Sequence, residues 1–127
     1  MPMLVDTDVL IWHLRGHASA ARRLDQLPQL TISAVTWCEL LQGMRSKDEL
    51  NATKKMLVRR QAIILPLTEP ITVDAIGLME ALSVGHGLQM ADALIAAIAR
   101  QHGLGLLTGN VKHFAPVDGL SIDAFAP

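Results

Sequence analysis

The chain has 127 residues, of which 50% are hydrophobic, 18% are charged and 3% are aromatic, and its formal net charge is −1. This composition excludes a disordered protein, and the length suits one domain that buries about two thirds of the surface of its unfolded chain. We therefore expect a single domain over residues 1–127, with a core built from aliphatic side chains.

The sequence lacks the marks of a disulfide-bonded, membrane-spanning or exported protein. Its single cysteine, Cys38, excludes an internal disulfide and a zinc site made of a cysteine cluster. No apolar run approaches the roughly 18 residues of a membrane helix, and the N-terminus lacks the charged start and long apolar region of a signal peptide. We expect a cytoplasmic protein with no membrane association, in which Cys38 is a buried apolar side chain on a helix.

Basic residues are concentrated in the first half of the chain. Residues 1–60 carry nine of the eleven Lys and Arg residues and six acids, a net charge of +3. Residues 61–127 carry two basic residues and six acids, a net charge of −4. The first half could attract phosphate groups, with Arg22 and Arg23 among the candidates. The alternative is that these charges are the solvated faces of surface helices.

In the first half of the chain, short apolar runs alternate with longer segments of helical periodicity. They predict strands near residues 3–6 and 30–32 and helices near residues 8–14, 18–27, 34–44 and 47–60. Ser33 is placed to cap the third of these helices, and Ser46 with Glu49 forms a capping box at the start of the fourth. The second strand is therefore expected to run directly into a helix.

The second half continues this alternation. It predicts a strand near residues 63–65, helices near 71–84 and 89–100, a strand near 104–107 and an edge strand near 120–122. Within residues 89–100, the side chains Ala91, Leu94, Ile95 and Ile98 form a continuous apolar face. Strands that alternate with helices predict an α/β fold, with a central, mainly parallel sheet of about four or five strands and helices on both faces.

Two carboxylates follow the first predicted strand. Asp6 and Asp8 lie two residues apart, with apolar residues on both sides. At a separation of about 4 Å and an effective dielectric constant of about 20, they would repel each other by roughly 4 kcal/mol. A bound divalent cation reverses the sign of this interaction, and ligands bind at the carboxyl ends of strands in α/β sheets. The pair therefore indicates a metal site, and the alternative for Asp8 is a cap of the first helix.

Four further polar residues could complete this site. If the first and fourth strands are neighbours, Thr108 and Asn110 join the carboxylate pair at one edge of the sheet. Glu39 and Asp92 lie within apolar helical segments, where the alternatives are a solvated charge for Glu39 and an acid that complements the helix dipole for Asp92. Oxygen ligands without a cysteine cluster or paired histidines favour Mg²⁺ or Mn²⁺ over zinc.

Four blocks of the sequence combine these polar residues with apolar neighbours. They are residues 4–8, residues 37–40 followed by Gly43, residues 92–97 and residues 107–114. In this order they resemble the motifs of the PIN domain and, within it, of the VapC-type toxin nucleases of toxin–antitoxin pairs. The resemblance spans nearly the whole chain.

The resemblance implies a three-layer α/β/α PIN fold and a toxic endoribonuclease of a type II toxin–antitoxin pair, which hydrolyses RNA phosphodiester bonds with Mg²⁺ or Mn²⁺. It implies metal-binding and catalytic roles for Asp6, Glu39 and Asp92. Thr108 and Asn110 would orient water or phosphate. The implied protein partners are a cognate antitoxin that covers the site and a second copy of the chain in a homodimer. The expected substrate is structured RNA with an exposed loop, such as tRNA or rRNA.

The chain departs from the family pattern around the last block. It has Asn110 where a fourth acid is expected and His113 where many relatives have Asp. Asn110 can ligate a metal or orient a water through its amide oxygen, but it brings no charge. Asp8 stands where relatives often have Asn or Ser, and as an additional metal ligand it would partly restore the missing charge.

The sequence also offers surfaces for the implied partners. Apolar residues near Trp12, Trp37, Leu41 and Met44 could receive an antitoxin helix, although core packing is the first expectation for Trp37. The helix near residues 71–84 could supply the homodimer contact.

Two other functions fit parts of the sequence. Asp6-Thr7-Asp8 also fits the Asp-x-Asp start of haloacid-dehalogenase-like phosphatases, but the later lysine, Lys112, lacks the context that those enzymes need. The non-enzymatic alternative is a PIN domain that binds RNA or antitoxin without cleavage. The intact trio of acids argues against it.

Overall fold

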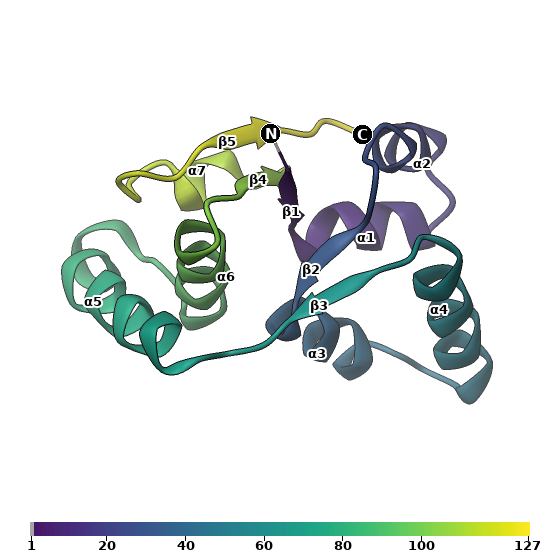
Figure 1. The fold of residues 1–127 in the computed structure, drawn as a ribbon, viewed down its shortest axis with the longest axis horizontal. Coiled ribbons are helices and arrows are strands. Elements are labelled where there is room, and N and C mark those ends of the chain that lie inside the picture. Colours follow the sequence, from purple (N-terminus) through teal and green to yellow (C-terminus); the bar gives the residue numbers. More distant parts are fainter. Residues whose placement is uncertain (1) are drawn as a thin grey trace.

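The computed structural model describes residues 2–127 (Figure 1). In chain order its elements are β1 (Met3–Val5), α1 (Thr7–Leu14), α2 (Ala18–Asp25), β2 (Thr31–Ser33), α3 (Ala34–Gln42), α4 (Lys47–Arg59), β3 (Ile63–Leu65), α5 (Glu69–His86), α6 (Met90–Gln101), β4 (Gly105–Thr108), α7 (Val111–Phe114) and β5 (Ile122–Ala124). None of these helices is both long and apolar enough to cross a membrane.

The strands pair in parallel. β1, β4 and β5 form a three-stranded sheet in the order β1-β4-β5, with Val5 opposite Leu107 and Leu106 opposite Ile122. β2 and β3 form a two-stranded sheet, and β2 lies beside β1 where the two sheets meet (Figure 1). The predicted parallel α/β arrangement is confirmed, and the strands are divided into groups of three and two.

Alternate residues of the central strands face opposite sides of the sheet. Leu4 and Leu106 belong to a core cluster with residues of α5, α6 and α7. Val5 and Leu107 belong to a second cluster with residues of α1, α2, α3 and α4. Because strand side chains alternate with a period of two, helices cover both faces of the sheet, which gives the expected three-layer α/β/α fold.

The first helix begins one residue earlier than predicted. Asp6 is the N-cap residue of α1, and its side chain accepts a hydrogen bond from the Thr7 backbone N–H. The alternative that Asp8 caps this helix is therefore wrong, because Asp8 lies within the first turn. The condition that the first and fourth strands are neighbours is met by the pairing of β1 with β4.

Other helix and strand boundaries differ from the predicted ones for identifiable reasons. α5 begins at Glu69, ahead of the predicted start, because Pro70 is tolerated in the first turn of a helix and Thr68 caps it. β5 lies two residues later than expected, where the Phe125 N–H donates to the Thr108 carbonyl. The helix α7 was not predicted, because a single turn is too short to show periodicity.

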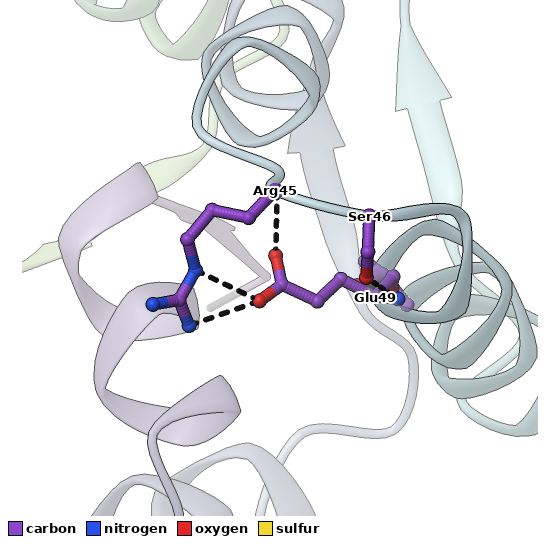
Figure 2. A network of polar contacts seen from close by, with 4 residues as sticks. Arg45, Ser46 and Glu49 are labelled. Atoms are coloured by element: carbon purple, nitrogen blue, oxygen red, sulfur yellow. Dashed lines mark hydrogen bonds and ion pairs between the residues drawn. The ribbon is translucent and has the colours of Figure 1, made fainter.

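The cap of α4 confirms the predicted capping box, with one difference (Figure 2). The Ser46 hydroxyl accepts from the Glu49 N–H at 3.1 Å. The Glu49 carboxylate reaches the backbone N–H of Arg45 at 2.8 Å and its side-chain Nε at 3.0 Å, one residue before the cap. These bonds lower the pKa of Glu49 and hold the connection between α3 and α4 in place.

The prediction that Cys38 is buried is wrong, because its side chain is exposed. α3 buries Thr36 and Leu40, and Cys38 lies on another side of the helix. Trp37 is half-buried and packs against the core cluster around Val5, as expected for a core residue. The apolar spacing in this segment indicated a helix but did not specify which residues face the sheet.

Candidate active site

Asp6 is the most buried acid of the site. It follows β1, and its side chain is 4% exposed. Its Oδ1 accepts from the Thr7 N–H at 2.8 Å and its Oδ2 accepts from the Thr108 hydroxyl at 2.7 Å. Because β1 and β4 are parallel neighbours, the carboxyl ends of these strands bring Asp6 and Thr108 together, as the sequence predicted.

The environment of Asp6 disfavours its charged form. Its pKa is raised from 3.8 to about 7, mainly by burial and also by the nearby carboxylates of Asp8 and Asp92, while the Thr108 hydrogen bond opposes the rise. A carboxylate held in this way gains most from a positive charge placed beside it.

Asp8 lies half-buried beside the loop that follows β4. Its Oδ2 accepts from the Gly109 N–H at 2.9 Å, whereas its Oδ1 is buried and has no hydrogen-bond partner among the described residues. A Cβ at position 109 would lie 2.6 Å from Oδ2, so glycine is required for this approach. Burial raises the pKa of Asp8. A buried carboxylate oxygen without a hydrogen-bond partner costs free energy. A bound cation would supply the missing partner.

Asp92 lies in the first turn of α6 and reaches the same space. Burial raises its pKa, and the carboxylates of Glu39 and Asp8 add to the rise. The opposing contribution comes from His113, whose Nδ1 lies 3.5 Å from Asp92 Oδ2. Asp92 therefore lies near enough to Glu39, Asp8 and Asp6 for their charges to interact.

Glu39 is the exposed acid of the group. It projects from α3, and its Oε1 accepts from the Thr7 hydroxyl at 2.6 Å. Asn110 is exposed after β4, and its backbone N–H donates to the Thr108 hydroxyl at 2.9 Å. Thr108 is fully buried, so its hydroxyl contacts Asp6 and Asn110 and does not face solvent. Sequence reasoning missed Thr7, because a threonine next to Asp6 carries no signal of a contact 32 residues away.

The acids supply the hard oxygen donors that Mg²⁺ and Mn²⁺ prefer, without cysteine sulfur. As they stand, no three His, Cys, Asp or Glu side chains in residues 2–127 lie close enough to form a complete metal cluster. Mutual repulsion keeps uncompensated carboxylates apart. The orphaned Asp8 oxygen and the raised pKa of Asp6 nevertheless fit a site whose charge is balanced by a cation.

A cavity of about 550 Å³ opens beside Glu39, between α1, α3 and α4. Its walls include the apolar side chains Ile11, Leu14, Leu40 and Met44, together with Arg15, Arg45 and Glu49. The acidic site at the sheet edge therefore borders, at Glu39, a cavity with two arginines in its wall. This cavity is large enough to admit a group from another molecule.

The layers and the sheet topology define an α/β protein in which Asp6 and Asp8 follow the carboxyl end of β1. The PIN domain family profile matches residues 3–120 of the chain. The chain is 37% identical to Ribonuclease VapC10 of Mycobacterium tuberculosis over 116 residues, which are 88% of this chain and 85% of that protein. It is 31% identical to Ribonuclease VapC1 of Rickettsia felis, covering 96% of this chain and 95% of that one.

A solved structure, the toxin–antitoxin complex from Klebsiella pneumoniae, has a chain of the same fold. Its TM-score is 0.79 at 29% identity, with 94% of this chain and 95% of that chain covered. The chain belongs to the PIN-domain family and, within it, to the VapC group. Because the chain belongs to this family, the phosphatase alternative suggested by Asp6-Thr7-Asp8 is wrong.

Proposed function

We propose that the protein is a metal-dependent endoribonuclease that acts in the cytoplasm as the toxin of a type II toxin–antitoxin pair. The observation that carries the proposal is Asp6, which is buried at the carboxyl edge of the sheet near enough to Asp8 and Asp92 for their charges to raise its pKa. Relatives that cover most of the chain are named ribonucleases, which supports the reaction class.

Asp6, Glu39 and Asp92 are the proposed ligands of Mg²⁺, with Mn²⁺ as the alternative ion. Asp8 is a further candidate ligand through its orphaned Oδ1. A bound ion of this kind lowers the pKa of a coordinated water and neutralises phosphate charge, which are the two requirements of phosphodiester hydrolysis.

The remaining site residues have positioning roles in this proposal. Thr108 holds Asp6 through the 2.7 Å hydrogen bond. Asn110, exposed at the same edge, orients the attacking water or the scissile phosphate and can also contact the ion through a water. His113 offsets the charge of Asp92, which lies 3.5 Å away. Hydrolysis leaves a 5′-phosphate and a 3′-hydroxyl.

RNA reaches the acids along the basic wall of the cavity. Arg15 and Arg45 line it next to Glu39, and because Arg45 forms an ion pair with Glu49 at 2.9 Å, Arg15 is the first candidate to bind phosphate. Of the pair first considered, Arg22 is exposed, whereas Arg23 is bound to Asp123 at 2.6 Å. A loop of a structured RNA, such as tRNA or rRNA, supplies the unpaired nucleotides that such a site can admit.

The proposed protein partners occupy two different surfaces. An antitoxin covers the cavity, whose walls combine apolar side chains from α1 and α3 with charged ones. A second copy of the chain packs against α5, where Val73 and Ile76 are 64% and 54% exposed. Exposed aliphatic side chains gathered on one helix are typical of a contact surface.

The test is to map RNA 5′ ends after the protein is induced in cells that lack the antitoxin. New ends at one defined site, and their absence when Asp6→Asn is induced, are the expected result. Purified protein should cleave the same RNA with Mg²⁺ and stop when EDTA is added. Cleavage that persists in EDTA or in Asp6→Asn would exclude the proposed site, and RNA binding without cleavage would favour the non-enzymatic alternative.

A further inference from the structure

Three buried hydroxyl groups lead from the start of α3 to Glu39. The Ser33 Oγ lies 3.2 Å from the Thr36 Oγ1, which lies 3.0 Å from the Thr7 Oγ1. The Thr7 Oγ1 in turn lies 2.6 Å from the Glu39 Oε1. Ser33 and Thr36 are fully buried and Thr7 is 8% exposed, so these groups are shielded from competing water.

The direction of these hydrogen bonds follows from the acceptor at the end. An ionised carboxylate can only accept, so the single Thr7 hydroxyl proton is donated to Glu39. The 3.0 Å contact with Thr36 then requires the Thr36 hydroxyl to donate to Thr7. By the same reasoning Ser33 donates to Thr36, and each bond polarises the next toward Glu39.

Thr7 contacts both ends of the acidic site. Its backbone N–H donates to Asp6 Oδ1 at 2.8 Å, while its hydroxyl donates to Glu39. Thr7 therefore fixes the position of Asp6, at the end of β1, relative to Glu39 on α3. Because the hydroxyl engages Oε1, it restrains the otherwise mobile Glu39 side chain and leaves Oε2 as a ligand atom.

We propose that Thr7 is a positioning residue that holds Glu39 ready for the metal, and that Thr36 and Ser33 support it through the directed hydroxyl chain. This inference rests on the proposed function, because Glu39 is one of the proposed ligands. Groups that orient metal ligands typically change metal affinity by about 10-fold to 100-fold when they are removed. Glu39, with its flexible stem on an exposed helix face, depends on such support more than the buried Asp6 does.

The test combines metal-free and metal-bound measurements on the full chain. In ¹³C-glutamate-labelled protein without metal, the carboxyl resonance of Glu39 is assigned by its loss in Glu39→Gln. Thr7→Val should shift this resonance, whereas Thr7→Ser, which keeps the hydroxyl, should leave it near its wild-type position. Thr72→Val, which removes a hydroxyl that donates to the Thr68 carbonyl at the start of α5, is the matched control.

The second measurement is Mn²⁺ affinity by calorimetry. Thr7→Val should weaken binding about 10-fold, Thr7→Ser should restore it, and Thr36→Val should give a smaller loss. In the Glu39→Gln background, Thr7→Val should add nothing, because Thr7 acts through Glu39. An equal loss in both backgrounds would mean that Thr7 has only a structural role and would overturn the inference.

The outcomes separate this inference from the proposed function. An unmoved Glu39 resonance in folded Thr7→Val overturns the inference, whatever the metal does. If Thr7→Val does not fold, Thr7→Ala, which removes the same hydroxyl, is measured in its place, and an unmoved resonance there has the same force. If wild-type protein neither binds Mn²⁺ nor cleaves RNA, the proposed function fails, and the metal-free resonance still decides whether Thr7 positions Glu39.

Discussion

Replacing Asp6 by Asn should stabilise the metal-free protein at alkaline pH while abolishing cleavage. In the folded chain burial raises the pKa of Asp6 from 3.8 to about 7. A carboxyl whose pKa is raised in the folded state stabilises the folded protein fully at pH values below its pKa in the unfolded state. This contribution is lost as the pH rises through its pKa in the folded state. Wild-type protein in EDTA should therefore lose stability between pH 4 and pH 7, approximately, and Asp6→Asn should not share this loss.

The size of the effect follows from the shift. A rise from 3.8 to about 7 is roughly three pKa units, which correspond to about 4 kcal/mol at pH 8 as an upper limit. Asn resembles the neutral carboxyl, and the hydrogen bonds from the Thr7 N–H and the Thr108 hydroxyl are already included in the net shift of the Asp6 pKa. We therefore expect Asp6→Asn to be up to about 4 kcal/mol more stable than wild type at pH 8 and roughly 1.5 kcal/mol more stable at pH 5.

The assay is urea unfolding of both proteins in EDTA at pH 5 and pH 8. The difference between the two proteins reports Asp6 together with the carboxylates that interact with it, Asp8 and Asp92, whereas distant groups such as His13 contribute equally to both. Asp118→Asn, which removes an exposed carboxyl, is the control variant. At pH 8, Mg²⁺ should stabilise wild type and have little effect on Asp6→Asn. If Asp6→Asn is no more stable than wild type at pH 8, the assigned environment of Asp6 is wrong.

Three further predictions concern the surroundings of this carboxylate. Asp8→Asn should reduce RNA cleavage less than Asp6→Asn in the same assay, and an equal or larger loss would make Asp8 a direct ligand. Gly109→Ala places a Cβ 2.6 Å from Asp8 Oδ2, so we expect a loss of about 1–3 kcal/mol in thermal unfolding together with reduced cleavage; unchanged values would show that the loop moves freely. Arg15→Glu with Arg45→Glu should weaken RNA binding and reduce the slope of log affinity against log salt by about 1 for each phosphate that an arginine no longer neutralises. An unchanged slope would remove this wall from the RNA path.

The sequence by itself determined the layers of the fold and most of the acidic site. Strand and helix periodicities, and local caps such as Ser33 and Ser46, depend on residues within one or two turns, so they can be read without a partner. The family blocks predicted a common site for Asp6, Glu39 and Asp92. That the first and fourth strands are neighbours was a condition of this site, and the pairing of β1 with β4 in the structure meets it.

Only the tertiary structure decided how each side chain is used. Whether Asp6 or Asp8 caps α1 depended on a small shift in where the helix begins, and the orphaned oxygen of Asp8 depends on the loop after β4. Cys38 is exposed because of the rotation of α3 against the sheet, which apolar spacing alone leaves undetermined. The contact from Thr7 to Glu39 joins residues 32 positions apart, and no local pattern encodes it. Such contacts arise from packing between elements, and that packing converts a set of acids into an ordered site.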